Sequence, residues 1–146
     1  MYSNCEGIDQ GDAVFVIASQ INHGLDLLDE EDELLRMPVA DLNIKAGEKA
    51  LDGCDHKTAY FYFIAALSLL PDDNWESHYD LSLRLNFFMA RASFSTCKYS
   101  EAELILHTIC EKARCLHDKL AAYVLLGESE FIGCIFIDFN DNLSSQ

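Results

Sequence analysis

The sequence predicts an all-α fold, an α-α solenoid of helix pairs, and three observations support this prediction. Half of the 146 residues are hydrophobic, which is enough apolar surface for a folded core. The chain has only 2 Pro and 7 Gly, a composition that favours long uninterrupted elements over a turn-rich β architecture. Apolar residues also recur at spacings of three and four along most of the chain, which is typical of amphipathic helices.

Six segments carry this helical pattern. Pro38 suits the first turn of the second segment, and Ser100 with Glu103 forms a capping box at the start of the fifth. We expect helices over residues 12–28, 38–51, 55–70, 74–95 and 100–114, and a sixth that begins near His117.

The third segment contains the run Tyr-Phe-Tyr-Phe-Ile at residues 60–64, which would suit a strand on propensity alone. We favour a helix because the apolar run continues through Leu67 and ends only at Pro71, which is too long for a typical strand. A helix that is apolar on nearly all sides is expected to be buried between neighbours.

The chain divides into three parts. Residues 1–11 are expected to be a flexible start, residues 12–129 a helical repeat domain, and residues 130–146 an atypical tail that is first apolar and then polar. The apolar stretch Phe131–Ile137 either covers the end of the stack or is an exposed patch. We expect the second, and therefore self-association through the C-terminal end that is relieved by ending the chain at Ser129.

An internal repeat is the most informative feature. A pattern of a small residue followed by defined positions at offsets of 12, 16, 19 and 24 occurs twice in the chain. The two copies begin 43 positions apart. The first copy is Gly47, Ala59, Phe63, Ala66 and Pro71, and the second is Ala90, Ala102, Leu106, Ile109 and Arg114. A small residue on the first helix of a pair lets the second helix approach closely, and the large apolar residue fills the space beside the crossing. Each pair leaves an apolar face uncovered, so pairs are expected to stack.

This pattern resembles the tetratricopeptide repeat, in which a small residue, Ala, a large apolar residue, Ala and Pro recur in this order. The first copy matches at every position, whereas the second has Ile109 for a small residue and Arg114 for Pro. The period of 43 also exceeds the usual length of about 34. We therefore expect tetratricopeptide-like pairs; the alternative is that two amphipathic hairpins share these offsets by chance.

Longer strings resemble one particular group of proteins. Asp41–Ala50, Ala65–Trp75 and His78–Leu83 are similar to the helical repeat region of large multidomain sensor kinases that carry an AAA-type ATPase domain. The resemblance covers roughly Val14–Leu126, and the chain departs from it after Gly127.

The resemblance implies a signalling context. In such proteins an ATPase domain precedes the repeats, a serine/threonine kinase domain often lies further upstream, and GAF and histidine-kinase domains often follow. This sequence contains no Gly-x-x-x-x-Gly-Lys-Ser/Thr phosphate loop and no kinase His-Arg-Asp or Asp-Phe-Gly motif. We therefore expect a chain without enzymatic activity and without a cofactor.

Charge and composition narrow the choice of partners. With 10 basic and 25 acidic residues the net charge is −15, so a nucleic acid or an anionic membrane surface is not an expected partner. No apolar stretch approaches the roughly 20 residues of a membrane helix, and no secretory signal is visible. The six Cys then suit a reducing compartment, and we expect a cytoplasmic location.

The candidate binding face follows from the tetratricopeptide resemblance. In that family, first-helix residues at −6, −3, +1 and +4 from the small residue face a concave groove. These positions are Asp41, Ile44, Glu48 and Leu51 in the first copy and Arg84, Phe87, Arg91 and Phe94 in the second. Arginine beside aromatic residues is typical of protein interfaces, so the partner is expected to be a protein or neighbouring signalling domains. The alternative is that both phenylalanines are core residues and both arginines are solvated.

A zinc site is the rival function. Four residues, His107, Cys110, Cys115 and His117, form a His-x2-Cys-x4-Cys-x-His cluster that could make a small metal-binding helical protein. Their spacing matches no common zinc module, and buried free cysteines are commoner. We therefore expect no metal site.

Overall fold

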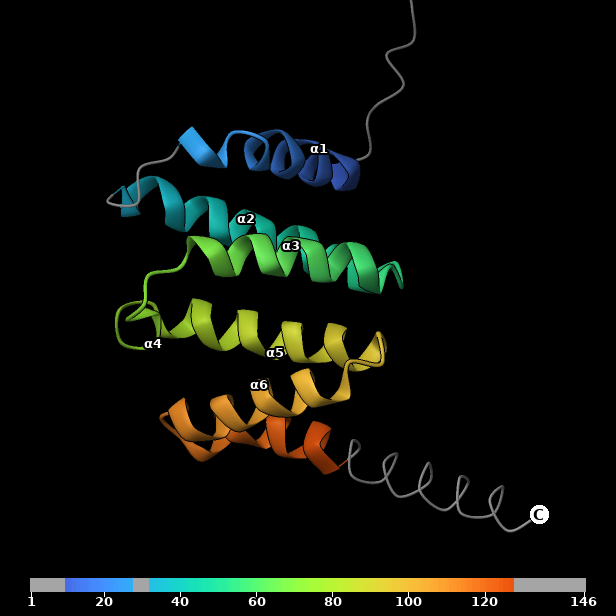
Figure 1. Cartoon of the computed structure of the whole chain (residues 1–146), viewed down its shortest axis with the longest axis vertical. Helices are drawn as coiled ribbons and strands as arrows, with labels where there is room; N and C mark the ends of the chain where they lie inside the picture. Colours follow the sequence, from blue (N-terminus) through green and yellow to red (C-terminus); the bar gives the residue numbers. More distant parts are fainter. Residues whose placement is uncertain (1–9, 28–31, 128–146) are drawn as a thin grey trace, which may run out of the picture. The chain divides into compact units, whose positions relative to one another are not determined.

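The computed structural model describes residues 10–27 and 32–127, and within them every regular element is a helix (Figure 1). The elements are α1 (Gln10–Asn22), a 3-10 turn (Leu25–Leu27), α2 (Glu33–Asp52), α3 (His56–Leu69), α4 (Asn74–Ser77), α5 (Tyr79–Ser95) and α6 (Tyr99–Lys112). Residues 116–127 are also helical and are called the last described helix below. The all-α prediction is confirmed, and no described helix is long and apolar enough to cross a membrane.

The chain forms two compact units, residues 1–74 and 75–146. In unit 1, α2 and α3 make an antiparallel hairpin, and α1 packs against α2. In unit 2, α5 and α6 make the corresponding hairpin. The expected tail at residues 130–146, including Phe131–Ile137, and most of the expected flexible start lie outside the described residues.

Both hairpins turn in the same way. The middle residue of each three-residue turn has a left-handed backbone, with φ of 59° at Cys54 and 61° at Cys97. In each turn the next residue donates its N–H to the carbonyl five positions earlier, at 2.8 Å from Asp55 to Ala50 and 2.9 Å from Lys98 to Ser93. A left-handed conformation is costly for a residue other than Gly, so the two hairpins share an unusual turn at positions 43 residues apart.

Eight of the ten repeat positions are buried, whereas Pro71 is half-buried and Arg114 is exposed. Seven of them, Ala59, Phe63, Ala66, Ala90, Ala102, Leu106 and Ile109, are at most 1% exposed. Gly47 is buried as well, and a Cβ atom added to it would lie 2.3 Å from Cε1 of Phe63. A gap this narrow leaves room only for hydrogen, which is the close approach that the repeat pattern predicts.

α2 begins earlier than predicted. It starts at Glu33, so Pro38 lies inside the helix and not in its first turn. Proline lacks the N–H that would bond to the carbonyl of Leu34. Leu34 is 88% exposed, so water can take the place of that donor.

The start of α6 also differs from the prediction. The helix begins at Tyr99, its N-cap is Lys98, and Lys98 makes no side-chain cap bond. The predicted capping box, with Ser100 as the N-cap and Glu103 as its partner, is therefore wrong, because the preceding turn places the N-cap at Lys98, two residues earlier. The corresponding position in the first hairpin does carry a side-chain cap, since the Thr58 N–H donates to Asp55 Oδ1 at 3.1 Å.

α3 confirms one prediction and corrects another. The aromatic run at residues 60–64 is helical. The helix is not buried on all sides, however, because Phe61 is 62% exposed and Ile64 and Leu67 are also exposed. The predicted helix over residues 74–95 is divided at His78 into α4 and α5.

Candidate functional site

The strongest candidate surface is one side of α5. Arg84, Phe87 and Phe94 are half-buried, and Arg91 is exposed. The Arg91 guanidinium lies 5.8 Å from the centroid of the Phe88 ring, which is within cation–π range, and Phe88 meets Phe87 edge-on at 5.7 Å. The structure thus brings arginine and aromatic groups together at the surface of unit 2.

Phe88 was missed by the sequence reasoning although it carries the arginine contact. The groove positions were taken from a repeat formula that selects Phe87, whereas the i, i+3 spacing of Phe88 and Arg91 on one helix could have identified the pair. Phe94, at the other end of the face, packs edge-on against Tyr99 of α6 with ring centroids 5.3 Å apart.

The predicted positions on α2 have a different character. Ile44 is fully buried, so its side chain is not available at the surface. Asp41 forms an ion pair with Lys45 at 2.6 Å, one turn further along the same helix. Glu48 and Leu51 are half-buried. The ion pair between Asp41 and Lys45, at positions i and i+4 of one helix, contributes little to stability because it lies at the surface.

An aromatic and charged cluster in unit 2 connects the start of α5 to the turn after α6. The Tyr79 hydroxyl donates to Asp118 Oδ2 at 2.7 Å and accepts the backbone N–H of Arg114 at 2.8 Å. The Arg114 guanidinium lies 4.1 Å from the centroid of the Tyr79 ring. Arg114 occupies the position that Pro71 has in the first repeat copy. In the second copy the contacts of Tyr79 with Arg114 and Asp118 fix the turn after the second helix, whereas in the first copy a proline ends that helix.

The charges of this cluster follow from its hydrogen bonds. Donation from Tyr79, and next from Cys115, holds the pKa of the Asp118 carboxyl below its usual value of 3.8. Burial and the neighbouring carboxylate raise the pKa of Tyr79, while the Arg114 N–H opposes that rise. The bonded Asp118 therefore stabilises the fold above its usual pKa, and this contribution is lost as the pH falls through its lowered pKa.

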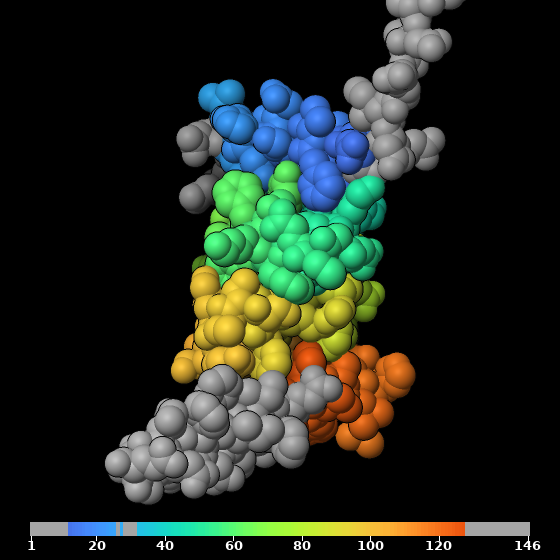
Figure 2. All heavy atoms as spheres, turned by 90° about the vertical axis from the view of Figure 1, so that its right-hand side faces the viewer, coloured from blue at the N-terminus to red at the C-terminus, as the bar shows by residue number. Residues whose placement is uncertain are grey.

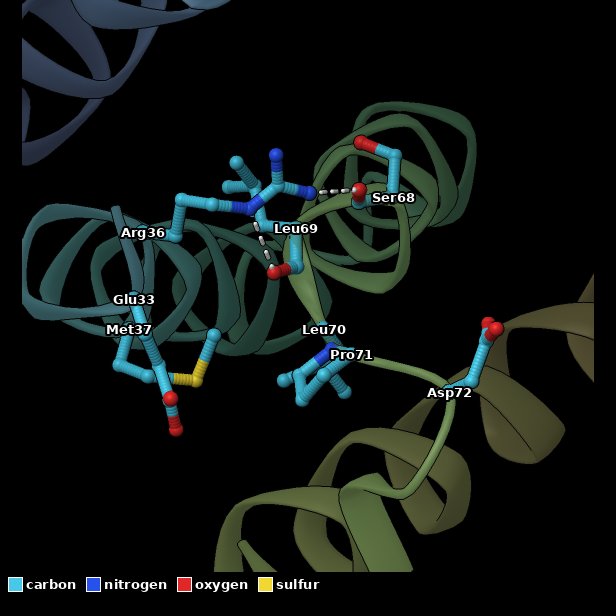
Figure 3. A pocket seen from close by; sticks show the side chains of 8 residues that line it. All are labelled: Glu33, Arg36, Met37, Ser68, Leu69, Leu70, Pro71 and Asp72. Atoms are coloured by element: carbon cyan, nitrogen blue, oxygen red, sulfur yellow. Dashed lines mark hydrogen bonds between the residues drawn. The ribbon is translucent and has the colours of Figure 1, made fainter. Parts of the chain in front are cut away.

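A pocket of about 430 Å³ in unit 1 lies between the start of α2 and the end of α3 (Figure 3). Arg36 reaches across it and donates to the carbonyls of Leu69 at 3.2 Å and Ser68 at 2.9 Å. These bonds satisfy carbonyl groups at the C-terminal end of α3, where a positive charge is favourable. Arg36 thus acts as a C-terminal cap of α3.

The metal cluster considered from the sequence is not formed. Across residues 10–27 and 32–127, no three His, Cys, Asp or Glu side chains are close enough to hold a metal ion. Cys110 is half-buried on α6, whereas His107, Cys115 and His117 are exposed. The zinc alternative is therefore corrected: the break between the helices separates the four residues.

The chain is similar to the hybrid signal transduction histidine kinase G of Dictyostelium discoideum, with 27% identity over 110 residues. The match covers 69% of this chain and 3% of the kinase. No family profile matches the chain, and no solved structure matches it. The similarity connects the chain to a signalling protein, of which it spans a small part.

Proposed function

We propose that this chain is a non-catalytic helical-repeat module that couples or recruits partners within a signalling protein. One observation carries the proposal: a chain whose described residues form helices is similar to a hybrid histidine kinase, and its sequence has no motifs for nucleotide binding or phosphoryl transfer. We place the module in the cytoplasm; the four described cysteines, all free, support a reducing compartment.

The proposed architecture is a solenoid of tetratricopeptide-like helix pairs. The burial of the first four positions of each repeat copy and the equal turns at Cys54 and Cys97 support it. In repeat proteins in general, a hairpin with one apolar face cannot bury that face alone, so neighbouring hairpins stack. Such arrays offer extended surfaces to protein partners.

The proposed partner surface is the side of α5 that carries Arg84, Phe87, Arg91 and Phe94, to which the structure adds Phe88. It combines two arginines with aromatic groups in a chain of net charge −15. A protein segment with acidic and apolar side chains would complement it. Such a segment could belong to another protein or to a neighbouring domain of the same assembly.

The test reverses the charge of this face. The chain with Arg84→Glu and Arg91→Glu is compared, as immobilised bait in extracts of its own cells, with the native chain and with a Lys57→Glu, Lys112→Glu control. The control makes the same charge change at two exposed lysines on other helices. We expect a protein that the native chain and the control retain, and that binds the arginine variant at least tenfold more weakly when purified and titrated.

Two results would count against the proposed face. One is equal retention of every bound protein by all three chains. The other is equal loss in both charge-reversed variants, which would show that overall charge and not this face governs binding. Circular dichroism of the three chains confirms in each case that the helices are intact.

A further inference from the structure

A second pocket of unit 1, of about 410 Å³, lies between α1 and the turn that joins α2 to α3. In Figure 2 this turn, in blue-green, faces the viewer beside α1 in blue. The residues that carry the argument below all line the pocket: Phe15, Lys49, Gly53, Asp55, Thr58 and Tyr62. Small-molecule sites in proteins commonly have volumes of roughly 300–1,000 Å³, so the pocket is large enough for a small ligand.

Two aromatic rings form one wall of this pocket. The ring centroids of Phe15 and Tyr62 lie 5.8 Å apart, and the Tyr62 hydroxyl donates to the Phe15 carbonyl at 3.4 Å. Tyr62 is also packed in a buried cluster with Ala18 of α1 and Ala46 of α2. These contacts hold the two rings in place, and aromatic rings pack favourably against the ring of an aromatic ligand.

The pocket is also lined by one positive and one negative side chain. Lys49 is half-buried in the last turn of α2, and Asp55 is the N-cap of α3. Thr58 donates its hydroxyl and its N–H to the Asp55 carboxylate, which fixes that carboxylate and holds its pKa below the usual value. The ionisable residues next to these two in the sequence do not line the pocket: Glu48, Asp52, His56 and Lys57. One ammonium and one carboxylate together complement a ligand that carries one charge of each sign.

Gly53 leaves space in the pocket although the turn does not require a glycine. Its backbone has φ of −82° and ψ of 7°, and Thr96, 43 positions later, has nearly the same values of −96° and 14°. Residues of every type adopt this right-handed conformation. A Cβ atom added to Gly53 would have no neighbour closer than 3.5 Å. A side chain is therefore compatible with the turn, and its absence at Gly53 keeps the pocket open.

The lining residues of the first hairpin differ from their counterparts in the second. Positions 49, 53, 58 and 62 correspond, 43 positions later, to Ala92, Thr96, Glu101 and Ile105. Ala92 is fully buried, so a hairpin of this kind forms without a lysine at that position. The shared hairpin packing thus does not account for the lysine, glycine and tyrosine of the first copy, whereas a ligand site does.

We propose that this pocket binds a free α-amino acid with an aromatic side chain. The ring of the ligand packs against Phe15 and Tyr62, its carboxylate pairs with the Lys49 ammonium, and its ammonium pairs with the Asp55 carboxylate. A residue within a peptide lacks both of these charges, so the pocket favours the free amino acid. This inference goes beyond the proposed coupling function and does not depend on it.

The test is isothermal titration calorimetry of the full chain with L-phenylalanine, for which we expect saturable binding at one site. Three related probes each lack one of the recognised groups. Phenethylamine lacks the carboxylate, phenylpropionate lacks the ammonium, and L-alanine lacks the ring. Each of these probes is expected to bind more weakly than phenylalanine by a factor of about ten or more, because each loses one of the three contacts.

Two variants test the pocket itself. Gly53→Thr installs the residue of the second hairpin and fills the pocket, and Lys49→Met removes the ammonium but keeps a long apolar side chain. Each is expected to weaken the binding of phenylalanine by a factor of about ten or more. Lys45→Met removes an exposed lysine of the same helix outside the pocket and is expected to bind as the native chain does. Circular dichroism checks that all three variants are folded.

Three results would overturn the proposal. The first is a native chain that does not bind phenylalanine, and the second is native affinity in a folded Gly53→Thr or Lys49→Met chain. The third is equal binding of phenylalanine and N-acetylphenylalanine amide, which lacks both charges, because the pocket would then accept the aromatic side chain of a protein. None of these results bears on the partner face of α5, which has its own test.

Discussion

Replacing Gly47 by Ala is expected to destabilise unit 1 by about 1–3 kcal/mol, the usual cost of overpacking a core. The direction of the change in stability is informative, because replacing Gly by Ala inside a helix ordinarily stabilises a protein by up to about 1 kcal/mol. Here the added methyl group would meet three atoms of the Phe63 ring at 2.3 to 2.7 Å, and Phe63 is fully buried. Urea denaturation monitored by circular dichroism measures the change.

The second hairpin suggests a compensating change. It pairs Ala90 with Leu106 at the positions where the first pairs Gly47 with Phe63, so a larger first-helix residue accompanies a smaller second-helix residue. Gly47→Ala combined with Phe63→Leu is therefore expected to recover most of the lost stability. Gly53→Ala is the control, since its Cβ would have no neighbour closer than 3.5 Å. A Gly47→Ala chain as stable as the native chain would show that the helices do not cross there.

Asn43→Asp is expected to cost about 3 kcal/mol or more at neutral pH, the scale of leaving a charge buried without a partner. Asn43 is fully buried and joins α1 to α2 through reciprocal amide bonds with Asn22, at 2.7 and 3.0 Å. Its amide also donates to the Val39 carbonyl at 2.9 Å. A carboxylate cannot donate, so one Asn22 contact and the Val39 contact become unfavourable.

The pH dependence of the stability of this variant provides a second test. Burial and the two facing carbonyl oxygens disfavour the ionised aspartate, so its pKa is expected to be raised in the folded state. The loss of stability should be small while the new carboxyl is protonated in both states and should grow as the pH rises above its unfolded pKa. Asn86→Asp, at a half-buried site on α5, is the control; a loss as large there would show that burial is not the cause.

The helices and the close approach of α2 and α3 at Gly47 could be predicted from the sequence because small residues at fixed offsets have a direct packing consequence. Gly47 and Phe63 report a helix crossing, and the structure places them in contact. The run at residues 60–64 could be assigned to a helix because its length and its end at Pro71 outweighed its strand propensity.

Features that depend on contacts between distant residues could not be predicted. The start of α6 was also missed although its cause is local, because the turn at Cys97, two residues before Tyr99, sets it and the capping box does not. The Asn22–Asn43 amide pair joins residues 21 positions apart, and the Tyr79–Arg114 contact joins residues 35 positions apart. No spacing pattern in the sequence predicts either contact. Both tie a helix end to its neighbour.

The candidate binding face was predicted in part. The repeat formula selected positions on α5 that lie at the surface, but the same formula on α2 selected Ile44, which is buried. A repeat pattern of this kind predicts a helix and the spacing of residues along it. Which side of that helix is buried depends on the neighbouring helices. The role of Phe88 beside Arg91 likewise depends on how the side chains lie, which the repeat pattern does not specify.

The central claim is that both hairpins share one packing register, 43 residues apart. The most direct measurement is a set of nuclear Overhauser contacts in the folded chain. We expect strong contacts between the Gly47 Hα atoms and the Phe63 ring, and equally strong contacts between the Ala90 methyl and the Leu106 methyls. Contacts in the first pair with none in the second, or a second hairpin displaced by one helical turn, would contradict the repeat.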